Sequence, residues 1–241
     1  MFKLKLKKTH DQSYSKKPSL TVICLHGISS SSKHFTNTLK FLEGTNSLKN
    51  VRFVAFDWLG NGKSKKSKKF EYTYDEQLEA LKNSIEKLKT DTPIILIGHS
   101  MGTLLAARYA FLHKKSIAKL ILVSPAVFSR EEIKFLTSNT ENNVFLKKVG
   151  AKELNDRAFR NSMQNIVMNI GNQKTFENLT TPAALIYGDE DPYISINNLK
   201  IIAKNNPKYL SLIKTPGRHS ISRDKYVKIL EILEDFLHET L

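Results

Sequence analysis

Ser100 stands at the centre of a Gly-x-Ser-x-Gly pattern formed with Gly98 and Gly102. An apolar, strand-like segment precedes the pattern, and a helix-like stretch begins at Met101. A serine on such a strand-to-helix turn sits on strained backbone with its hydroxyl exposed. Glycine fits both flanking positions, because side chains there would collide as the strand and the helix close on each other. The pattern predicts that Ser100 is a nucleophile.

A serine nucleophile needs a base, and elimination leaves His219. In strand–turn–helix sites of this kind the nucleophile precedes the acid and the histidine in the chain. Of the three histidines after Ser100, His113 and His238 lie at the ends of helical segments, where capping and the helix dipole account for them. His219 lies in a loop after the strand-like residues 209–213, from which an imidazole can reach a serine hydroxyl. We therefore expect His219 to be the general base.

The acid that orients this imidazole should lie between the serine and the histidine, at the end of another strand. The apolar segment 183–187 is such a strand, and three carboxylates follow it: Asp189, Glu190 and Asp191. Asp191 precedes a proline, which limits its backbone to extended forms and fixes its direction. We predict Asp191 as the acid, with Asp189 as the alternative.

The oxyanion of a tetrahedral intermediate needs hydrogen-bond donors. One should be the backbone N–H of Met101, directly after the nucleophile, and a second should come from the loop after the first central strand. That loop follows the apolar residues 20–24 and begins His26-Gly27-Ile28. We assign the Ile28 N–H as the second donor, whose loss would cost about 3–4 kcal/mol of barrier. A plain turn is the alternative interpretation of His26 and Gly27.

Together these motifs resemble the α/β-hydrolase superfamily, in the order that this family has them. The matching blocks are 25–27, 57–64, 98–102 and 188–191, with His219 after them. In the second block Trp58 replaces the commoner small or proline residue. The resemblance implies hydrolysis of a small-molecule carboxylic ester by a serine esterase or lipase-like enzyme. It argues against the dehalogenase and epoxide hydrolase branches, whose nucleophile is aspartate.

Strand-like and helix-like segments alternate along the 241 residues. This alternation predicts an α/β fold with a mostly parallel central sheet and helices on both faces. The resemblance to α/β hydrolases implies a core of residues 1–126 and 181–241, with a small helical cap inserted at 127–180. Apolar residues at helical spacing predict amphipathic helices over 74–88 and 226–237.

The inner face of the cap is expected to line an acyl pocket, which in a small cap would favour short to medium chains. The candidate pocket residues are His26, Gly27, His99, Phe128, Phe159 and Met163. Packing of the cap on the core is the alternative explanation for its apolar residues. No His-x-x-x-His or Cys-x-x-Cys spacing occurs, so the predicted chemistry uses no metal and no cofactor.

Two other functions stay open from the sequence. A thioesterase or a carbon–carbon bond hydrolase of the same fold would show the same triad and oxyanion hole. A non-enzymatic ligand-binding module on this scaffold is the third hypothesis, and the complete set of triad residues speaks against it.

The formal net charge is +15, and lysine outnumbers arginine 31 to 7. Scattered lysines of this kind fit the codon bias of an A/T-rich coding sequence. The dense run Lys63–Lys69 contains no aromatic residue for base stacking, so we expect no nucleic-acid partner. The run is a candidate for weak contact with an anionic membrane surface.

The sequence predicts a cytoplasmic setting. Cys24 is the only cysteine, so no internal disulfide can form. No apolar stretch approaches the ~20 residues that span a bilayer, and no secretory signal follows the basic N-terminus. The alternation of Phe2, Leu4 and Leu6 with lysines predicts an edge strand there.

Overall fold

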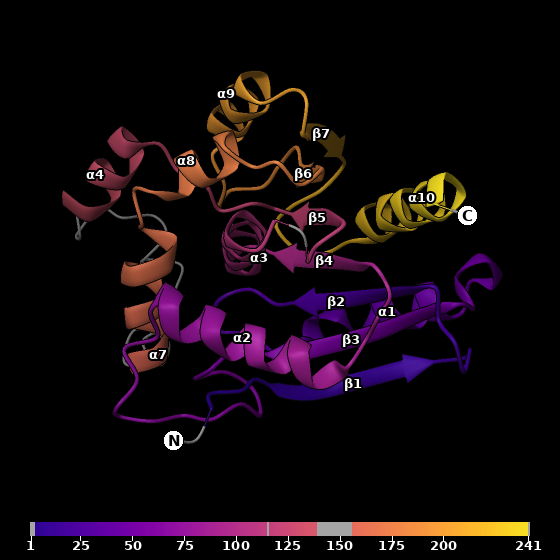
Figure 1. Cartoon of the computed structure of the whole chain (residues 1–241). Helices are drawn as coiled ribbons and strands as arrows, with labels where there is room; N and C mark the ends of the chain where they lie inside the picture. Colours follow the sequence, from indigo (N-terminus) through magenta and orange to yellow (C-terminus); the bar gives the residue numbers. More distant parts are fainter. Residues whose placement is uncertain (1–2, 115, 139–155, 241) are drawn as a thin grey trace.

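The computed structural model describes residues 3–114, 116–138 and 156–240, and contains one seven-stranded sheet (Figure 1). The strand order is β1-β3-β2-β4-β5-β6-β7, with β1 antiparallel to β3 and every other pair parallel. The strands are β1 (Lys7–Ser13), β2 (Leu20–Leu25), β3 (Val51–Asp57), β4 (Ile94–His99), β5 (Lys119–Val123), β6 (Ala183–Gly188) and β7 (Leu210–Thr215). The predicted mostly parallel sheet is confirmed.

Helices cover both faces of the sheet. The helices are α1 (Thr36–Glu43), α2 (Tyr74–Leu88), α3 (Met101–Leu112), α4 (Arg130–Ser138), α7 (Arg157–Ser162), α8 (Asn172–Glu177), α9 (Ile196–Asn205) and α10 (Arg223–Thr240). Short helical turns are η1 (Ser32–Phe35), η2 (Asn46–Leu48) and the π-helical η3 (Met163–Val167). Helices α2, α3 and α9 contribute to the apolar core on one face, and α1 and α10 to the core on the other.

Strand β2 shows why the central strands are continuous apolar runs. Ile23 and Leu25 belong to the core that contains α2 and α3, whereas Val22 and Cys24 belong to the core that contains α1 and α10. Successive side chains of a strand point to opposite faces, so a strand covered on both sides is apolar at every position.

Helix α2 begins at Tyr74 because Thr73 and Glu76 form a capping box. The Glu76 N–H donates to Thr73 Oγ1 at 3.3 Å, and the Thr73 N–H donates to a Glu76 carboxylate oxygen at 3.3 Å. Two donors that the helix itself cannot satisfy are thereby paired. The predicted helix over 74–88 is confirmed.

The N-terminal edge strand lies later in the chain than predicted. Strand β1 begins at Lys7, whereas Leu4 and Leu6 precede it and pack against the core beside α2. The Leu6 N–H donates to Ser84 Oγ of α2 at 2.8 Å, and Asn83 of the same helix donates to the Leu4 carbonyl. At Leu4 and Leu6 the alternation therefore reflects packing against a helix, and the prediction of a strand at these two residues was wrong. Phe2, the third residue of the predicted pattern, lies outside the described residues.

Helices α4, α7 and α8 lie beyond the carboxyl ends of β2, β4 and β5 (Figure 1). They belong to the predicted cap, of which residues 139–155 lie outside the described part. Phe159, Ile166 and Phe176 of this region are buried in the same core as α3. Helices α7 and α8 and the turn η3 therefore share their apolar core with the sheet domain.

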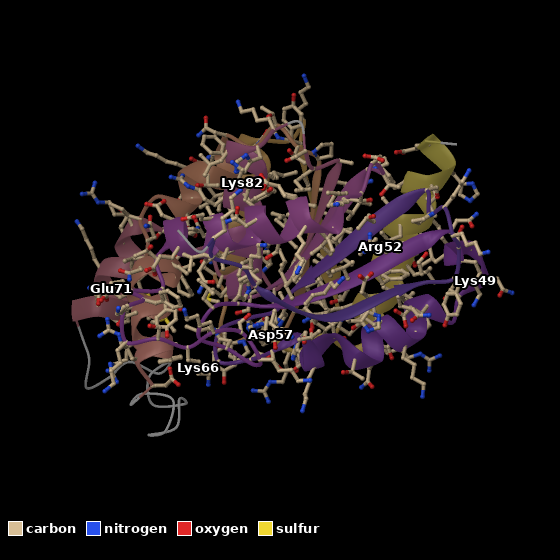
Figure 2. All side chains as sticks on the ribbon, turned by 60° about the horizontal axis from the view of Figure 1, so that its bottom comes forward. Lys49, Arg52, Asp57, Lys66, Glu71 and Lys82 are labelled. Atoms are coloured by element: carbon tan, nitrogen blue, oxygen red, sulfur yellow. The ribbon has the colours of Figure 1, made fainter. Side chains whose placement is uncertain are left out.

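Basic side chains are spread along the face shown in Figure 2. Lys49 and Lys66 lie on opposite sides of this view, with Asp57 between them.

Within the described residues, no helix combines the length and the apolar character needed to cross a bilayer.

Asp11 on β1 and Arg52 on β3 form an ion pair at the sheet edge (Figure 2 labels Arg52). Arg52 Nε and Nη2 lie 2.8 and 2.9 Å from the two Asp11 oxygens. The hydrogen bond from this guanidinium is the largest cause that lowers the pKa of Asp11 to about 2.

A carboxyl whose folded-state pKa is depressed stabilises the fold above its unfolded pKa, and this contribution is lost as the pH falls through the folded pKa. We expect Asp11→Asn to have a lower Tm than wild type at pH 7. Between about pH 4 and pH 2 the difference should shrink, because only the wild type loses this pair. Calorimetry across this range checks the prediction, and a constant difference in Tm would contradict it.

Candidate active site

Ser100 joins β4 to α3 in a strained conformation, with φ 52° and ψ −120°. Its N–H donates to the Val123 carbonyl of the neighbouring strand at 3.0 Å. A Cβ atom at Gly98 would lie 2.7 Å from the Gly102 carbonyl oxygen, and one at Gly102 would lie 2.2 Å from the Leu25 oxygen. The predicted need for glycine at both positions is confirmed.

His219 and Asp191 form a hydrogen-bonded pair at the carboxyl edge of the sheet. His219 Nδ1 lies 2.9 Å from Asp191 Oδ2 and 3.0 Å from Oδ1. The Asp191 side chain is fully buried, whereas 21% of the His219 side chain is exposed. One imidazole nitrogen is thus held by a carboxylate, while the ring keeps access to the surface.

The Asp191 carboxylate is held in its charged form. Burial alone would raise its pKa, but the hydrogen bond and the charge of His219, the Tyr193 N–H at 3.0 Å and Ser124 together lower it. The net pKa lies below the ordinary value. An ionised carboxylate at this position fixes the proton of a neutral imidazole on Nδ1, which leaves Nε2 unprotonated.

Asp189, the alternative acid, has a different partner. It is exposed, and its Oδ1 accepts the Gly217 N–H at 3.1 Å. This backbone hydrogen bond is the largest cause that lowers the pKa of Asp189. Asp189 therefore ties the loop after β6 to the loop that carries His219, and the geometry favours Asp191 as the acid.

The loop of His219 meets the serine turn through His99, the residue before Ser100. His99 Nε2 donates to the His219 carbonyl at 2.9 Å, and the two ring centroids lie 5.0 Å apart. Within the described residues, no hydrogen bond links Ser100 Oγ to the His219 ring. Such bonds are often long in ligand-free sites and tighten when substrate binds.

His99 is a buried support of the site and not an open pocket wall. Only 5% of the residue is exposed, and its ring stacks on His34 with centroids 4.4 Å apart. Its Nδ1 has no partner in the described part of the chain. Burial and the neighbouring histidines hold the pKa of His99 well below its ordinary value, so its Nδ1 stays unprotonated.

His26 is likewise fully buried. The Trp58 N–H donates to its Nε2 at 3.1 Å, the Trp58 indole donates to its carbonyl at 2.9 Å, and its Nδ1 lies 2.7 Å from the Gly27 carbonyl. Burial is the main cause that lowers the pKa of His26 to about 4. The neutral ring links two loops, so the structure gives His26 a packing role and not the pocket role proposed from the sequence.

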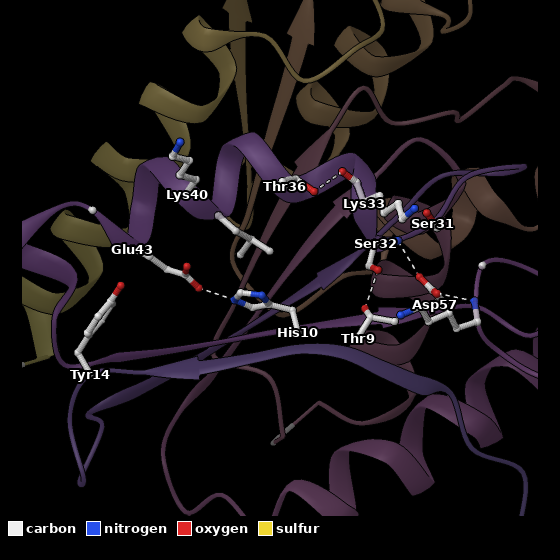
Figure 3. Close-up of a pocket in the computed structure, with 14 residues that line it drawn as sticks. Thr9, His10, Tyr14, Ser31, Ser32, Lys33, Thr36, Lys40, Glu43 and Asp57 are labelled. Carbon is white, nitrogen blue, oxygen red and sulfur yellow. Dashed lines mark hydrogen bonds and ion pairs between the residues drawn. The ribbon is translucent and has the colours of Figure 1, made fainter.

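Asp57 holds the far end of the loop that follows β2 and begins with His26 (Figure 3). Its two carboxylate oxygens accept the N–H groups of Ser32 and Lys63, each at 2.7 Å. A cavity of about 730 Å³ opens beside Asp57, between β1 and α1. His10 and Glu43 form an ion pair on its wall.

The two expected oxyanion donors flank the serine. Met101 is the first residue of α3, where an N–H has no acceptor within its own helix. Ile28 follows Gly27, and a Cβ atom at Gly27 would lie 3.1 Å from Ser100 Cβ. Gly27 therefore lets the loop that contains Ile28 approach Ser100.

The three apolar pocket candidates separate into two groups. Phe128 lines a cavity of about 460 Å³ together with Phe135 and Ile194. Phe159 and Met163 are 5% and 8% exposed and lie in the core. The structure therefore gives Phe159 and Met163 the packing role that was the alternative interpretation.

Sequence reasoning missed Ser124 and Lys225, which lie beside His219. Lys225 shares helical spacing with the buried Ile229 and Ile232, and this spacing was the signal that could have found it.

Among the described residues, no group of three histidine, cysteine or acidic side chains is placed to hold a metal ion.

Residues 21–152 match the sequence model of the alpha/beta hydrolase fold family. The probable lysophospholipase BODYGUARD 5 of Arabidopsis thaliana is 35% identical over 120 residues, which are 49% of this chain and 27% of that protein. The human monoacylglycerol lipase ABHD6 is 32% identical over 111 residues, 46% of this chain and 31% of the relative. The matches thus span about a third or less of these curated relatives.

A solved monoacylglycerol lipase from Paleococcus ferrophilus superposes with a TM-score of 0.69 at 19% identity. The superposition covers 97% of this chain and 98% of the lipase. This likeness extends over the whole fold, including the parts beyond the family match. The chain belongs to the alpha/beta hydrolase fold family.

Proposed function

We propose that this protein is a serine hydrolase of carboxylic esters with Ser100, His219 and Asp191 as its catalytic triad. The observation that carries the proposal is the buried Asp191 carboxylate at 2.9 Å from His219 Nδ1. This pair lies in loops that border the strained turn of Ser100. A paired imidazole beside a serine on such a turn is the arrangement that activates a hydroxyl for nucleophilic attack.

In the proposed reaction His219 Nε2 accepts the proton of Ser100 as its Oγ attacks the ester carbonyl. The N–H groups of Ile28 and Met101 donate to the oxyanion that forms. The tetrahedral intermediate collapses, and His219 passes its proton to the leaving alcohol. Water then attacks the acyl-serine by the same steps and releases the acid.

The names of the relatives support an ester of a fatty acid as substrate. They include probable lysophospholipases and a monoacylglycerol lipase. The cavity lined by Phe128, Phe135 and Ile194 offers an apolar surface for an acyl chain. Ile194, on its wall, follows Asp191 by three residues. We propose short to medium acyl chains, because the predicted cap is small.

Ser100→Ala should lower kcat on p-nitrophenyl esters by roughly 10⁶-fold, because the nucleophile is lost. Fluorophosphonate labelling should disappear in this variant and persist in Ser116→Ala, whose exposed hydroxyl lies after α3. Labelling that survives Ser100→Ala would refute the nucleophile. An unlabelled wild type would favour a ligand-binding module.

A chain-length series from acetyl to palmitoyl esters tests the acyl preference. We expect kcat/KM to be highest for short to medium chains, since a small cap can shield only part of a long chain from water. Thioesters and β-diketones in the same panel separate the thioesterase and carbon–carbon hydrolase alternatives. Equal rates across the ester series would contradict the proposed pocket.

Asp191→Asn should lower kcat by about 10⁴-fold, because the amide no longer holds the imidazole in the required tautomer. Asp189→Asn is the matched control, because the amide oxygen can still accept the Gly217 N–H and the side chain at this position makes no hydrogen bond to the ring. Steady-state kinetics of both variants decide the acid. A large loss at Asp189 with a small loss at Asp191 would reverse the assignment.

A further inference from the structure

Lys225, the third residue of α10, donates its ammonium protons to the loop of His219. Its Nζ binds the Arg218 carbonyl, the Ser220 carbonyl at 2.9 Å and Ser124 Oγ at 3.1 Å. An ammonium group has three N–H donors, and these three acceptors match them. The two carbonyls flank His219, so one cation binds the loop on both sides of the proposed base.

The carbonyl of His219 is bound as well. Ser124 Oγ donates to it at 3.1 Å from the end of β5, and His99 Nε2 donates to it at 2.9 Å from the end of β4. Three consecutive carbonyls of the loop are thus held by side chains from β4, α10 and the residue after β5. Ser124 belongs to both parts of the network, because it accepts from Lys225 and donates to His219.

Lys225 occupies a position that is unfavourable for a lysine. It is 0% exposed, and it lies in the first turn of a helix, where the dipole favours negative charge. Burial lowers the pKa of its ammonium, and the nearby Asp191 carboxylate opposes that shift. A buried cation needs compensating partners, and most of those that Lys225 has belong to the His219 loop.

The His219 loop is also tied at its start. Gly217 has φ +101°, its N–H donates to Asp189 Oδ1 at 3.1 Å, and its carbonyl accepts the Glu190 N–H at 3.2 Å. The side chains of Lys225, Ser124 and His99 hold the three carbonyls that follow. The position of the imidazole therefore depends on both sets of contacts, and Lys225 supplies two bonds of the second set.

We propose that Lys225 is a positioning residue, which holds the His219 loop so that the imidazole stays between Asp191 and Ser100. This inference rests on the proposed function of His219 as general base. Lys225 touches neither substrate nor the reacting atoms. It acts through the backbone of the loop, with Ser124 as an intermediary.

The test compares Lys225→Met, which keeps the length of the side chain and removes its donors, with Lys228→Met on the same helix. Lys228 forms an exposed ion pair with Glu231, and among the described contacts none joins its ammonium to the His219 loop. Measurements are made well below the Tm of each variant. We expect Lys225→Met to lower kcat on a p-nitrophenyl ester by about 10- to 100-fold, since a misplacement of about 1 Å has effects of this size.

The KM of Lys225→Met should change by less than about twofold, and its fluorophosphonate labelling rate should fall with kcat, because the loss lies in activation of Ser100 and not in ester binding. Lys228→Met should match wild type. Amide hydrogen exchange of residues 216–221 should rise in Lys225→Met and stay unchanged in the control.

Ser124→Ala provides a second test that does not depend on the folding of Lys225→Met. It should lower kcat in the same direction with KM unchanged. Combined with Lys225→Met it should cost less than the product of the two losses, because both act on one network.

A lower Tm with unchanged kcat in Lys225→Met, or a raised KM alone, would overturn the positioning role. Ser124→Ala with wild-type kcat would also overturn it. These results with an active wild type would leave the proposed hydrolase intact. A wild type that neither hydrolyses esters nor reacts with fluorophosphonate would instead refute the proposed function.

Discussion

The strained turn at Ser100 is the constraint on which the rest of the site depends. A non-glycine residue at φ 52° persists only where its surroundings hold it. Here β4 is buried between β2 and β5, and α3 packs so closely that only glycine fits at positions 98 and 102. The cost of the turn is thereby offset by the burial of the sheet centre. The neighbouring loops are then built around a hydroxyl whose position is fixed.

The histidines around this turn are neutral. Burial holds the pKa values of His26, His34 and His99 below their ordinary range. These rings therefore act as neutral hydrogen-bonding and stacking groups close to the serine. In the described part of the chain, the Asp191 carboxylate and the Lys225 ammonium are charged groups buried beside the His219 loop, and each is matched to hydrogen-bonding partners.

The fold was largely predictable because its signals are local. Apolar runs predicted the central strands, and helical spacing predicted α2 and α10. The edge strand was misplaced because alternating apolar residues have the same appearance whether they face a sheet or a helix. Within α10, the apolar spacing that predicted the helix was that of Tyr226, Leu230, Leu233 and Leu237. Of these only Leu233 is fully buried, together with Lys225 and Ile229, and the other three are partly buried against the same core. A lysine on the buried face is not visible in an apolar pattern.

The sequence by itself determined the fold class and the candidate residues Ser100, Asp191 and His219, because glycine spacing, a following proline and chain order are visible in one dimension. Only the tertiary structure shows that Asp191 contacts the His219 ring whereas Asp189 accepts a backbone N–H, since both residues follow β6 in the chain. It alone placed Lys225 and Ser124, which lie 101 positions apart, at the His219 loop. Their partners there include backbone carbonyls, which every residue carries, so these contacts have no signature in the sequence.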